Sequence, residues 1–369
     1  MTVDKVEVDG RVLSTKPPIL PLMMTAEYAL FHHLAGWTMM EDRTQTRWMI
    51  RVMVVSLILL PMCLAACLFA GLARRFGLSD SMAHALTAAL LFGTHIAGFS
   101  PHINNHVPAI ACLCVVLYAS IGLLNGHLQR RPLWLSVYGF AGALVFTLDM
   151  PATVYVALAG APLLFRYRLE AVLWGGAGMA LPLLGHFSAM LISSGSLLAI
   201  QMRPELYFYE ASYWRNPGGI DALNEPKGWY LFHMTFGRYG TFLLFPVLLF
   251  GLASAARECW KPTRLRAYVL TGLAGFVLLT TYYVLKTNNY GGAAYGFRWH
   301  MASAPVLLLM AVPLFQSLGL RRLAPLFLAA FAVSTFSAYE CWKSPWETDH
   351  EWTARHVYGP AVITERPAE

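Results

Sequence analysis

The chain has 369 residues, of which 57% are hydrophobic and 13% are charged, about half of the roughly 25% of charged residues that soluble domains carry. The mean hydropathy is +0.51. These values exclude an ordinary soluble domain. The net charge of +7 does not indicate a partner made of nucleic acid, because the basic residues are distributed over short connections between apolar segments.

Apolar runs without charged residues follow one another from residue 52 to residue 339. A helix needs roughly 20 apolar residues to cross a bilayer, and strand-like alternation is absent, so helices are expected. The run 81–129 is long enough for two spans, joined at "SPHINNH" (100–106). The sequence therefore predicts an all-α fold, a polytopic transmembrane helical bundle of about ten spans. The predicted spans are 52–73, two within 81–129, 132–148, 150–165, 171–202, 239–256, 267–285, 299–320 and 323–339.

Basic residues mark every second connection between these spans. They are Arg74 and Arg75, Arg130 and Arg131, Arg166 and Arg168, the group Arg257, Lys261, Arg264 and Arg266, and Arg321 and Arg322. The connections 100–106 and 149–151 carry no Lys or Arg. Such a distribution predicts that the basic connections lie in the cytoplasm. The alternate connections then face outward, as does the long connection at 193–238 and the stretch 286–300.

This orientation divides the chain into three parts. Residues 1–47 are expected to form an outer-face loop with an interfacial helix. Residues 48–339 form the transmembrane bundle with its outer loop at 193–238, and residues 340–369 form an outer-face polar tail. The start of the chain is polar and has no signal-peptide core, so we expect a further span upstream of it.

The segment 16–37 has the pattern of an interfacial helix. Its apolar residues have helical spacing and are interrupted by Glu27, His32 and His33, as in helices that lie on a membrane surface. Two prolines suit the first turn of this helix, and Lys16 directly precedes them. A cation at a helix N-terminus favours a bound phosphate; a lysine that extends toward lipid headgroups is the alternative.

The stretch "KTNNYGGAAYGFRWH" (286–300) places an arginine between two apolar runs. Moving Arg298 into the bilayer core would cost ~2.5–3.5 kcal/mol, so a reason for its position is needed. Gly291, Gly292 and Gly296 allow tight backbone turns around it. A guanidinium that binds an anionic lipid headgroup explains the arrangement.

Other outward-facing groups have alternative explanations. Asp149 is either a site residue or the cap of the next helix. His102 and His106 are four residues apart and would suit a metal on one helical face, but the two asparagines between them favour a turn. The aromatic residues of 207–214 and 229–239 form either an interfacial belt or surfaces that stack on sugars.

Three stretches resemble the GT-C superfamily of polyprenyl-phosphate-sugar-dependent membrane glycosyltransferases, which includes protein O-mannosyltransferases and the lipid A aminoarabinose transferase. "DGRVLSTKPPILPL" (9–22) is similar to the D-G-x-x-Y-S-x-K-P-P-L-L-P element of their first outer loop. "NNYGGAAYGFRWHMASAPVLLL" (288–309) is similar to their late element Y-G-G-x-x-x-G-x-R-W. "TQTRWMIRV" (44–52) has the arginine that is usual at the start of their second span.

The resemblance implies transfer of a sugar from a polyprenyl-phosphate carrier to an acceptor at the outer face of a bacterial cytoplasmic membrane. By motif match, Lys16 and Arg298 hold the leaving phosphate, and a divalent metal is possible. In the family a carboxylate shortly after the first span acts as base, and here the carboxylates nearest to that place are Asp9, Asp4 and Glu7. The outward-facing residues predicted to bind substrate or phosphate are Lys16, Arg298, Tyr290, Lys286, His300, Asp149, Asn105 and His106.

Two other functions remain open from the sequence. A transporter or flippase of lipid-linked sugars would carry ionisable residues at mid-membrane and internal repeats, whereas the ionisable residues here lie at span ends. A non-catalytic partner that binds the lipid carrier for another enzyme would need the phosphate-binding cations but no base.

Overall fold

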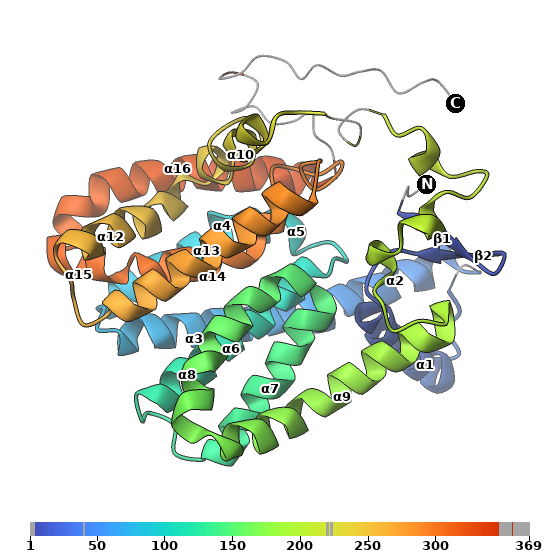
Figure 1. The fold of residues 1–369 in the computed structure, drawn as a ribbon, viewed down its shortest axis with the longest axis horizontal. Coiled ribbons are helices and arrows are strands. Elements are labelled where there is room, and N and C mark those ends of the chain that lie inside the picture. Colours follow the sequence, from blue (N-terminus) through green and yellow to red (C-terminus); the bar gives the residue numbers. More distant parts are fainter. Residues whose placement is uncertain (1–3, 40, 219–220, 222–223, 347–355, 357–369) are drawn as a thin grey trace.

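The computed structural model describes residues 4–39, 41–218, 221, 224–346 and 356. It is 74% helical, which confirms the predicted all-α fold. Figure 1 shows the long helices lying side by side, with the N-terminal hairpin at one end of the bundle. The helices of the bundle are α2 (Arg43–Val54), α3 (Leu60–Arg75), α4 (Asp80–Phe92), α5 (His95–Phe99), α6 (His106–Leu124), α7 (Arg131–Leu148), α8 (Thr153–Tyr167), α9 (Leu169–Ser194), α12 (Leu249–Trp260), α13 (Arg266–Lys286), α14 (Ala304–Met310), α15 (Val312–Leu318) and α16 (Leu320–Lys343).

Six helical segments are long and apolar enough to cross a membrane. They are Arg43–Arg75, which includes α2, a π-helical turn and α3, then His106–Leu124, Arg131–Leu148, Leu169–Ser194, Arg266–Lys286 and Arg321–Lys343. The other predicted spans form shorter or broken helices, such as α14 and α15. The chain is therefore a helical membrane protein by the length and apolarity of its helices, and the count of ten spans is not confirmed.

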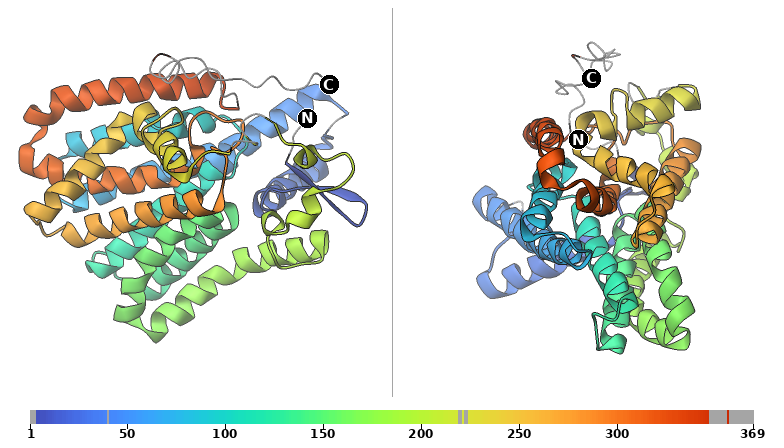
Figure 2. Two further views of the ribbon diagram at one scale, coloured as in Figure 1. Left: turned by 45° about the horizontal axis from the view of Figure 1, so that its top comes forward. Right: turned by 90° about the vertical axis from the view of Figure 1, so that its left-hand side faces the viewer.

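The basic connections gather at one end of the bundle. Gln316 Nε2 donates to the carbonyl of Phe76 at 2.6 Å, and Arg264 donates to the same carbonyl at 3.4 Å. Arg166 Nη1 donates to the carbonyl of Leu124 at 2.8 Å. These bonds join connections that are far apart in the sequence, as expected if every second connection lies on one side. The left view of Figure 2 shows the N-terminal hairpin at the opposite end.

Residues 5–14 form a β-hairpin, which differs from the expectation that strand patterns are absent. Strands β1 (Lys5–Val8) and β2 (Arg11–Ser14) pair antiparallel. The Asp9-Gly10 turn has positive φ at both residues, the geometry that favours a two-residue hairpin. Val6 and Val8 alternate on the buried face. The hairpin lies outside the six candidate spans, so helices still form all of them.

The predicted interfacial helix exists as α1 (Ile19–Ala35), which packs against α2, α7 and α9. Ile19 and Leu20 at its start are buried. Ser56 donates to the carboxylate of Glu27 at 2.6 Å, which fixes the helix to the first long helical segment. Leu34 is 78% exposed, as expected for a side chain that contacts lipid at the membrane surface.

Helices α7 and α9 approach each other through small residues. A Cβ at Gly139 would lie 2.0 Å from the carbonyl oxygen of Gly175, and a Cβ at Gly178 would lie 2.0 Å from that of Ser136. Small residues at such contacts let two helix backbones come close, which is how membrane helices associate without a hydrophobic driving force. This contact holds α9, whose end carries the chain to the outer loop.

Gly178→Ala should lower the melting temperature of the protein in detergent micelles by several degrees, because overpacking a close contact costs ~1–3 kcal/mol. Gly176→Ala is the matched control, since nothing lies within 4 Å of a Cβ there and alanine has the higher helix propensity. Equal melting temperatures for the two variants would contradict the close approach of α7 and α9.

Candidate functional site

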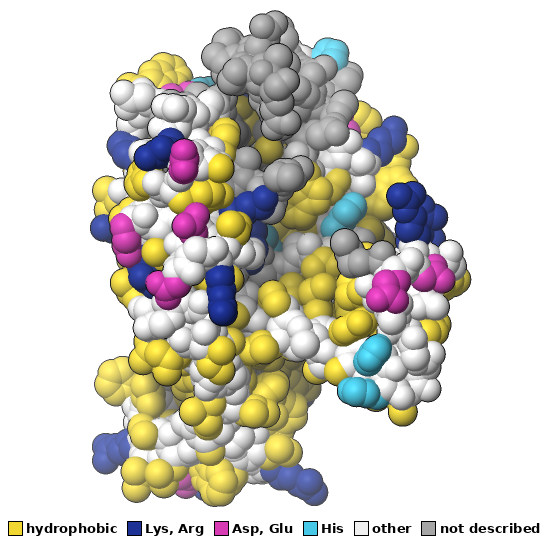
Figure 3. Space-filling view, turned by 90° about the vertical axis from the view of Figure 1, so that its right-hand side faces the viewer, with side chains coloured by type: hydrophobic (Ala, Val, Ile, Leu, Met, Phe, Trp, Pro, Cys, Tyr) yellow, Lys and Arg dark blue, Asp and Glu magenta, His cyan; other side chains and the backbone are white. Residues whose placement is uncertain are grey.

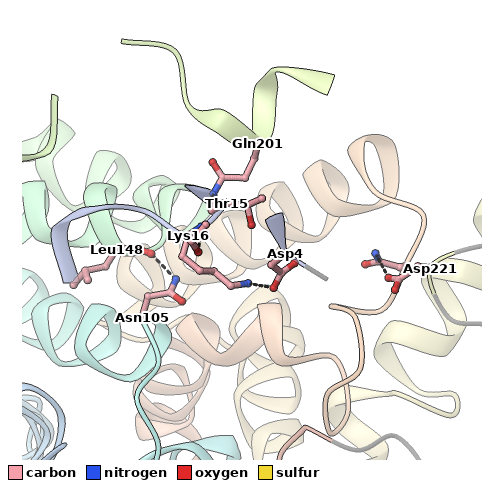
Figure 4. A network of polar contacts seen from close by, with 9 residues as sticks. Asp4, Thr15, Lys16, Asn105, Leu148, Gln201 and Asp221 are labelled. Carbon is pink, nitrogen blue, oxygen red and sulfur yellow. Dashed lines mark hydrogen bonds and ion pairs between the residues drawn. The ribbon is translucent and has the colours of Figure 1, made fainter. Parts of the chain in front are cut away.

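The N-terminal hairpin brings Lys16 and Asp4 together. Lys16 Nζ lies 2.6 Å from Asp4 Oδ2, and the backbone N–H of Thr15 donates to the carbonyl of Asp4. The side chain of Gln201, from the outer loop, donates to the carbonyl of Thr15. Figure 4 shows the ion pair of Lys16 with Asp4 and the contact of Gln201 with Thr15, together with the separate bond between Asn105 and Leu148. Lys16 thus has a fixed partner on the hairpin and faces the end of the bundle.

The ends of α6 and α7 supply a second polar pair. His106 Nδ1 lies 2.9 Å from Asp149 Oδ2, and both side chains are buried. Asn105 Nδ2 donates to the carbonyl of Leu148 at 2.6 Å, which joins the two helix ends. The Asp149 side chain makes no capping hydrogen bond at the helix that follows it, so the capping alternative is wrong.

Residues 287–297 form the turn that positions Arg298. Gly291, Gly292 and Gly296 all have positive φ, a region that glycine adopts at little cost, so this part of the prediction is confirmed. Backbone bonds hold the turn at both sides: Phe297 N–H donates to the carbonyl of Tyr239 at 2.8 Å, and Tyr295 N–H donates to that of Pro345.

Arg298 is a partly buried cation without full hydrogen bonding. Its Nε is buried and has no hydrogen-bond partner among the residues that the structure describes. The guanidinium carbon lies 5.2 Å from the ring centroid of Trp346, within the range of a cation–π contact. Burial lowers the pKa of Arg298, and the negative charges of Asp4 and Asp149 oppose this effect. Because a guanidinium stays protonated, the site holds a positive charge that an anion would stabilise.

Asp221 is a site residue that sequence reasoning missed. It lies in the outer loop, where Asn289 Nδ2 donates to its Oδ1 at 2.9 Å and the Tyr213 hydroxyl donates to its Oδ2 at 3.2 Å. Burial raises the pKa of Asp221, and the negative charge of Asp4 raises it further. Arg298 lowers it. No local motif surrounds this aspartate, so only the fold reveals its neighbours.

The charges of three distant segments therefore act on one another. Asp4 pairs with Lys16 and is close enough to Arg298 and Asp221 to change the pKa of both. Asp149 also acts on Arg298. The predicted phosphate-binding residues Lys16 and Arg298 thus share an acidic neighbour, although they come from opposite ends of the chain.

Five other predicted residues lie apart from this group or have structural partners. The hydroxyl of Tyr290 donates to Glu225, and its ring stacks on Tyr239 with centroids 4.3 Å apart. His300 is buried between the hydroxyls of Thr241 and Thr280, at 2.9 and 3.1 Å. Lys286 is exposed at the end of α13. Asp9 is exposed at the hairpin turn, and Glu7 lies on the strand face opposite Val6 and Val8.

Aromatic residues of the outer loop cover the site. Tyr207 is hydrogen-bonded to Thr15, and burial raises its pKa to about 12. Its ring lies 6.0 Å from that of Trp214. Figure 3 shows this end of the molecule, which is hollowed between two raised parts, with hydrophobic side chains visible in the hollow and charged side chains on both sides of it.

A second hollow lies on the side of the bundle. It measures about 470 Å³ and is lined almost entirely by apolar side chains of α3, α4, α5 and α16, among them Phe92, Ile96 and Trp342. Its lining residues Ala97 and Ser100 flank Phe99, whose ring lies 5.1 Å from that of Trp346. Trp346 is also the ring under Arg298, so ring contacts connect Phe99, next to the lining of this apolar groove, with the cation.

Within the described residues, no group of three or more His, Cys, Asp or Glu side chains could hold a metal ion. His102 and His106 do not form such a group: His102 Nδ1 lies 3.2 Å from the carbonyl of Gly98, and His106 pairs with Asp149. The charged groups of the site are the cations Lys16 and Arg298 and the carboxylates Asp4, Asp149 and Asp221.

The comparisons with known proteins identify no relative. No family model matches the chain, and neither a curated protein nor a solved structure matches it.

Asn289→Ala should raise the pKa of Asp221, because it removes a hydrogen bond that stabilises the carboxylate. The carboxyl stretching band in infrared difference spectra, assigned with Asp221→Asn, would report the titration. Asn288→Ala is the control, since Asn288 accepts a hydrogen bond from Lys227 instead. An unchanged midpoint in Asn289→Ala, or the same rise in Asn288→Ala, would contradict the assigned contact.

Proposed function

We propose that the chain is a GT-C-like membrane glycosyltransferase that transfers a sugar from a polyprenyl-phosphate carrier to an acceptor. The observation that carries the proposal is that Asp4, which pairs with Lys16 at 2.6 Å, also acts electrostatically on Arg298. These two cations are the residues to which the sequence resemblance assigns the carrier phosphate, and they come from the two motifs that are similar to the family.

The electrostatics of Arg298 support binding of a leaving phosphate. One cation 4 Å from a phosphate oxygen contributes ~4 kcal/mol at an effective dielectric constant near 20. When the bond between the sugar carbon and the phosphate oxygen breaks, its electron pair stays on the phosphate. Lys16 and Arg298 would then stabilise the transition state more than the bound carrier, which lowers the barrier.

A carboxylate next to the phosphate would accept the proton of the attacking acceptor group. Asp221 is better suited to this role than Asp4, because Asp4 is paired with Lys16 at 2.6 Å, whereas the pKa of Asp221 is raised by burial. A base with a pKa nearer to the working pH is the more effective one, and a general base contributes roughly 10²–10⁴-fold to the rate. Since the base must be ionised, the rate should rise with pH through this raised pKa.

The apolar groove supports a carrier with a long hydrocarbon chain. It is lined by residues of α3, α4, α5 and α16, and Phe99 beside its lining contacts Trp346, the ring under Arg298. A prenyl chain in the groove would leave its phosphate at the end of the bundle, where the cations lie. The same geometry would suit a non-catalytic protein that binds the carrier, so activity has to separate the two.

Arg298→Ala should reduce binding of a polyprenyl-phosphate sugar and, with a competent acceptor, reduce kcat/KM by roughly 10²–10³-fold, as for other preorganised donors to a developing anion. Arg298→Lys should recover part of the binding but not the guanidinium geometry. Arg11→Ala removes an exposed cation from the hairpin turn and should have no effect. Undiminished carrier binding in Arg298→Ala would reject the proposed site.

Asp221→Asn separates the enzyme from a carrier-binding partner. In an enzyme, this variant should keep carrier binding while its transfer rate falls by at least roughly 10²-fold, and the pH dependence of kcat should lose its acid limb. If the unaltered protein binds the carrier but cleaves no sugar–phosphate bond with any acceptor offered, the chain is a binding partner.

A further inference from the structure

A cavity of about 330 Å³ lies at the basic end of the bundle, away from the proposed catalytic site. It is bordered by the end of α6, the start of α7 and the end of α8, and its lining residues are Leu123, Gly126, Leu128, Gln129, Arg131, Arg166 and Tyr167. The lining contains two guanidinium groups and no carboxylate. Basic pockets between transmembrane helices on the cytoplasmic side are typical binding sites for the headgroups of anionic lipids.

The two arginines of the cavity share one aromatic ring. The guanidinium carbons of Arg131 and Arg166 each lie 5.7 Å from the ring centroid of Tyr167. The hydroxyl of Tyr167 donates to the carbonyl of Leu123 at 2.8 Å, so the ring is held in place. Arg166 is also held, because its Nη1 donates to the carbonyl of Leu124. The fixed ring places both positive charges at one cavity.

One exposed carboxylate borders this cluster. Arg131 Nη1 lies 3.7 Å from Glu170 Oε2, and both side chains are about half exposed, so water screens this surface pair. A third guanidinium, that of Arg75, lies near Leu128 of the cavity lining. A Cβ on Gly122 would lie 2.6 Å from Leu128 Cδ1 and 3.2 Å from Arg75 Nη1. Arg75 Nη1 is buried and has no hydrogen-bond partner among the described residues.

Exposed apolar side chains lie close to both arginines in the sequence. Leu133 follows Arg131 and is 51% exposed, and Phe165 precedes Arg166 and is 84% exposed. These side chains belong to helices that run into the predicted membrane region. A ligand bound to both arginines would therefore lie with one side against lipid-facing side chains.

We propose that this cavity binds the phosphate group of an anionic glycerophospholipid of the adjoining leaflet. A phosphate diester offers oxygens to both guanidinium groups, which are the side chains that suit phosphate geometry best. The acyl chains of the lipid would lie along the apolar surface beside Leu133 and Phe165. The site does not depend on the proposed transferase activity.

The test measures lipid retention by the full-length protein. The unaltered chain, Arg131→Gln, Arg166→Gln and Arg166→Lys are purified in detergent, equilibrated with phosphatidylglycerol or cardiolipin, and measured by native mass spectrometry, with phosphatidylcholine as the neutral lipid. Arg130→Gln is the matched control, since Arg130 is adjacent to Arg131 in the sequence but is not part of the cavity lining. A thermal-shift series with inorganic phosphate tests whether the cavity binds a soluble phosphate compound instead of a lipid.

The unaltered chain should retain the anionic lipids and not the neutral one. Arg131→Gln and Arg166→Gln should each reduce the apparent affinity about tenfold, since a hydrogen bond to a charged group contributes roughly 1.5–3 kcal/mol. Arg166→Lys should recover part of it, and Arg130→Gln should bind normally. Because Arg166 also bonds to the end of α6, a Gln variant counts only if its melting temperature without lipid is unchanged.

Two results would overturn the lipid site. Equal loss of retention in Arg130→Gln would show that only the general positive charge of this end attracts the lipid. Stabilisation by inorganic phosphate that depends on Arg131 and Arg166, without selective retention of anionic lipid, would assign the cavity to a soluble phosphate ligand.

Discussion

The positive charge of Arg298 is the constraint to which the end of the bundle next to the N-terminal hairpin is adapted. A buried guanidinium is costly unless opposite charges and hydrogen bonds compensate for its lost hydration. Here the compensation comes from Asp4 in the N-terminal segment, Asp149 at the end of α7 and Asp221 in the outer loop, together with the face of Trp346. Four stretches of the chain therefore have to meet around one residue, and its Nε still has no hydrogen-bond partner within the described part of the chain.

Local backbone geometry makes this meeting possible. The glycine turn before Arg298 adopts positive φ three times, and a Cβ at Gly291 would lie 3.2 Å from the Cγ of Arg298. The hairpin supplies Lys16 and Asp4 as a preformed pair. The His106–Asp149 pair connects the start of α6 to the end of α7. Each element is stabilised by its own short-range contacts, so the charges are held at the end of the bundle before any ligand binds.

The sequence predicted the helical bundle well because apolar runs and charge placement are directly readable. Every predicted span coincides with a helix or a group of short helices, but run length alone does not reveal where a helix breaks, as between α14 and α15. The hairpin at 5–14 has a recognisable sequence pattern, an Asp9-Gly10 turn between alternating valines. The apolar runs of the remaining chain favour helices, and the pattern is short beside them. Lys16 and Arg298 lie in recognisable motifs, whereas no motif marks Asp221, whose pKa is raised by burial in the fold and by Asp4, a residue distant in sequence.

The two ends of the bundle differ in the charges that they carry. Arginines with few acidic partners line the end that holds Arg131 and Arg166, and mixed charges from distant segments surround Arg298 at the other. The central claim is that the Lys16 and Arg298 segments lie on one side of the membrane, opposite the basic connections. Labelling of sealed, right-side-out vesicles with a membrane-impermeant maleimide tests it, using Arg11→Cys, Asn288→Cys and the native exposed Cys259 next to the basic α12–α13 connection. The account predicts that both introduced cysteines react in intact vesicles, and Cys259 only after permeabilisation; reaction of Arg11→Cys and Asn288→Cys from different sides would contradict it.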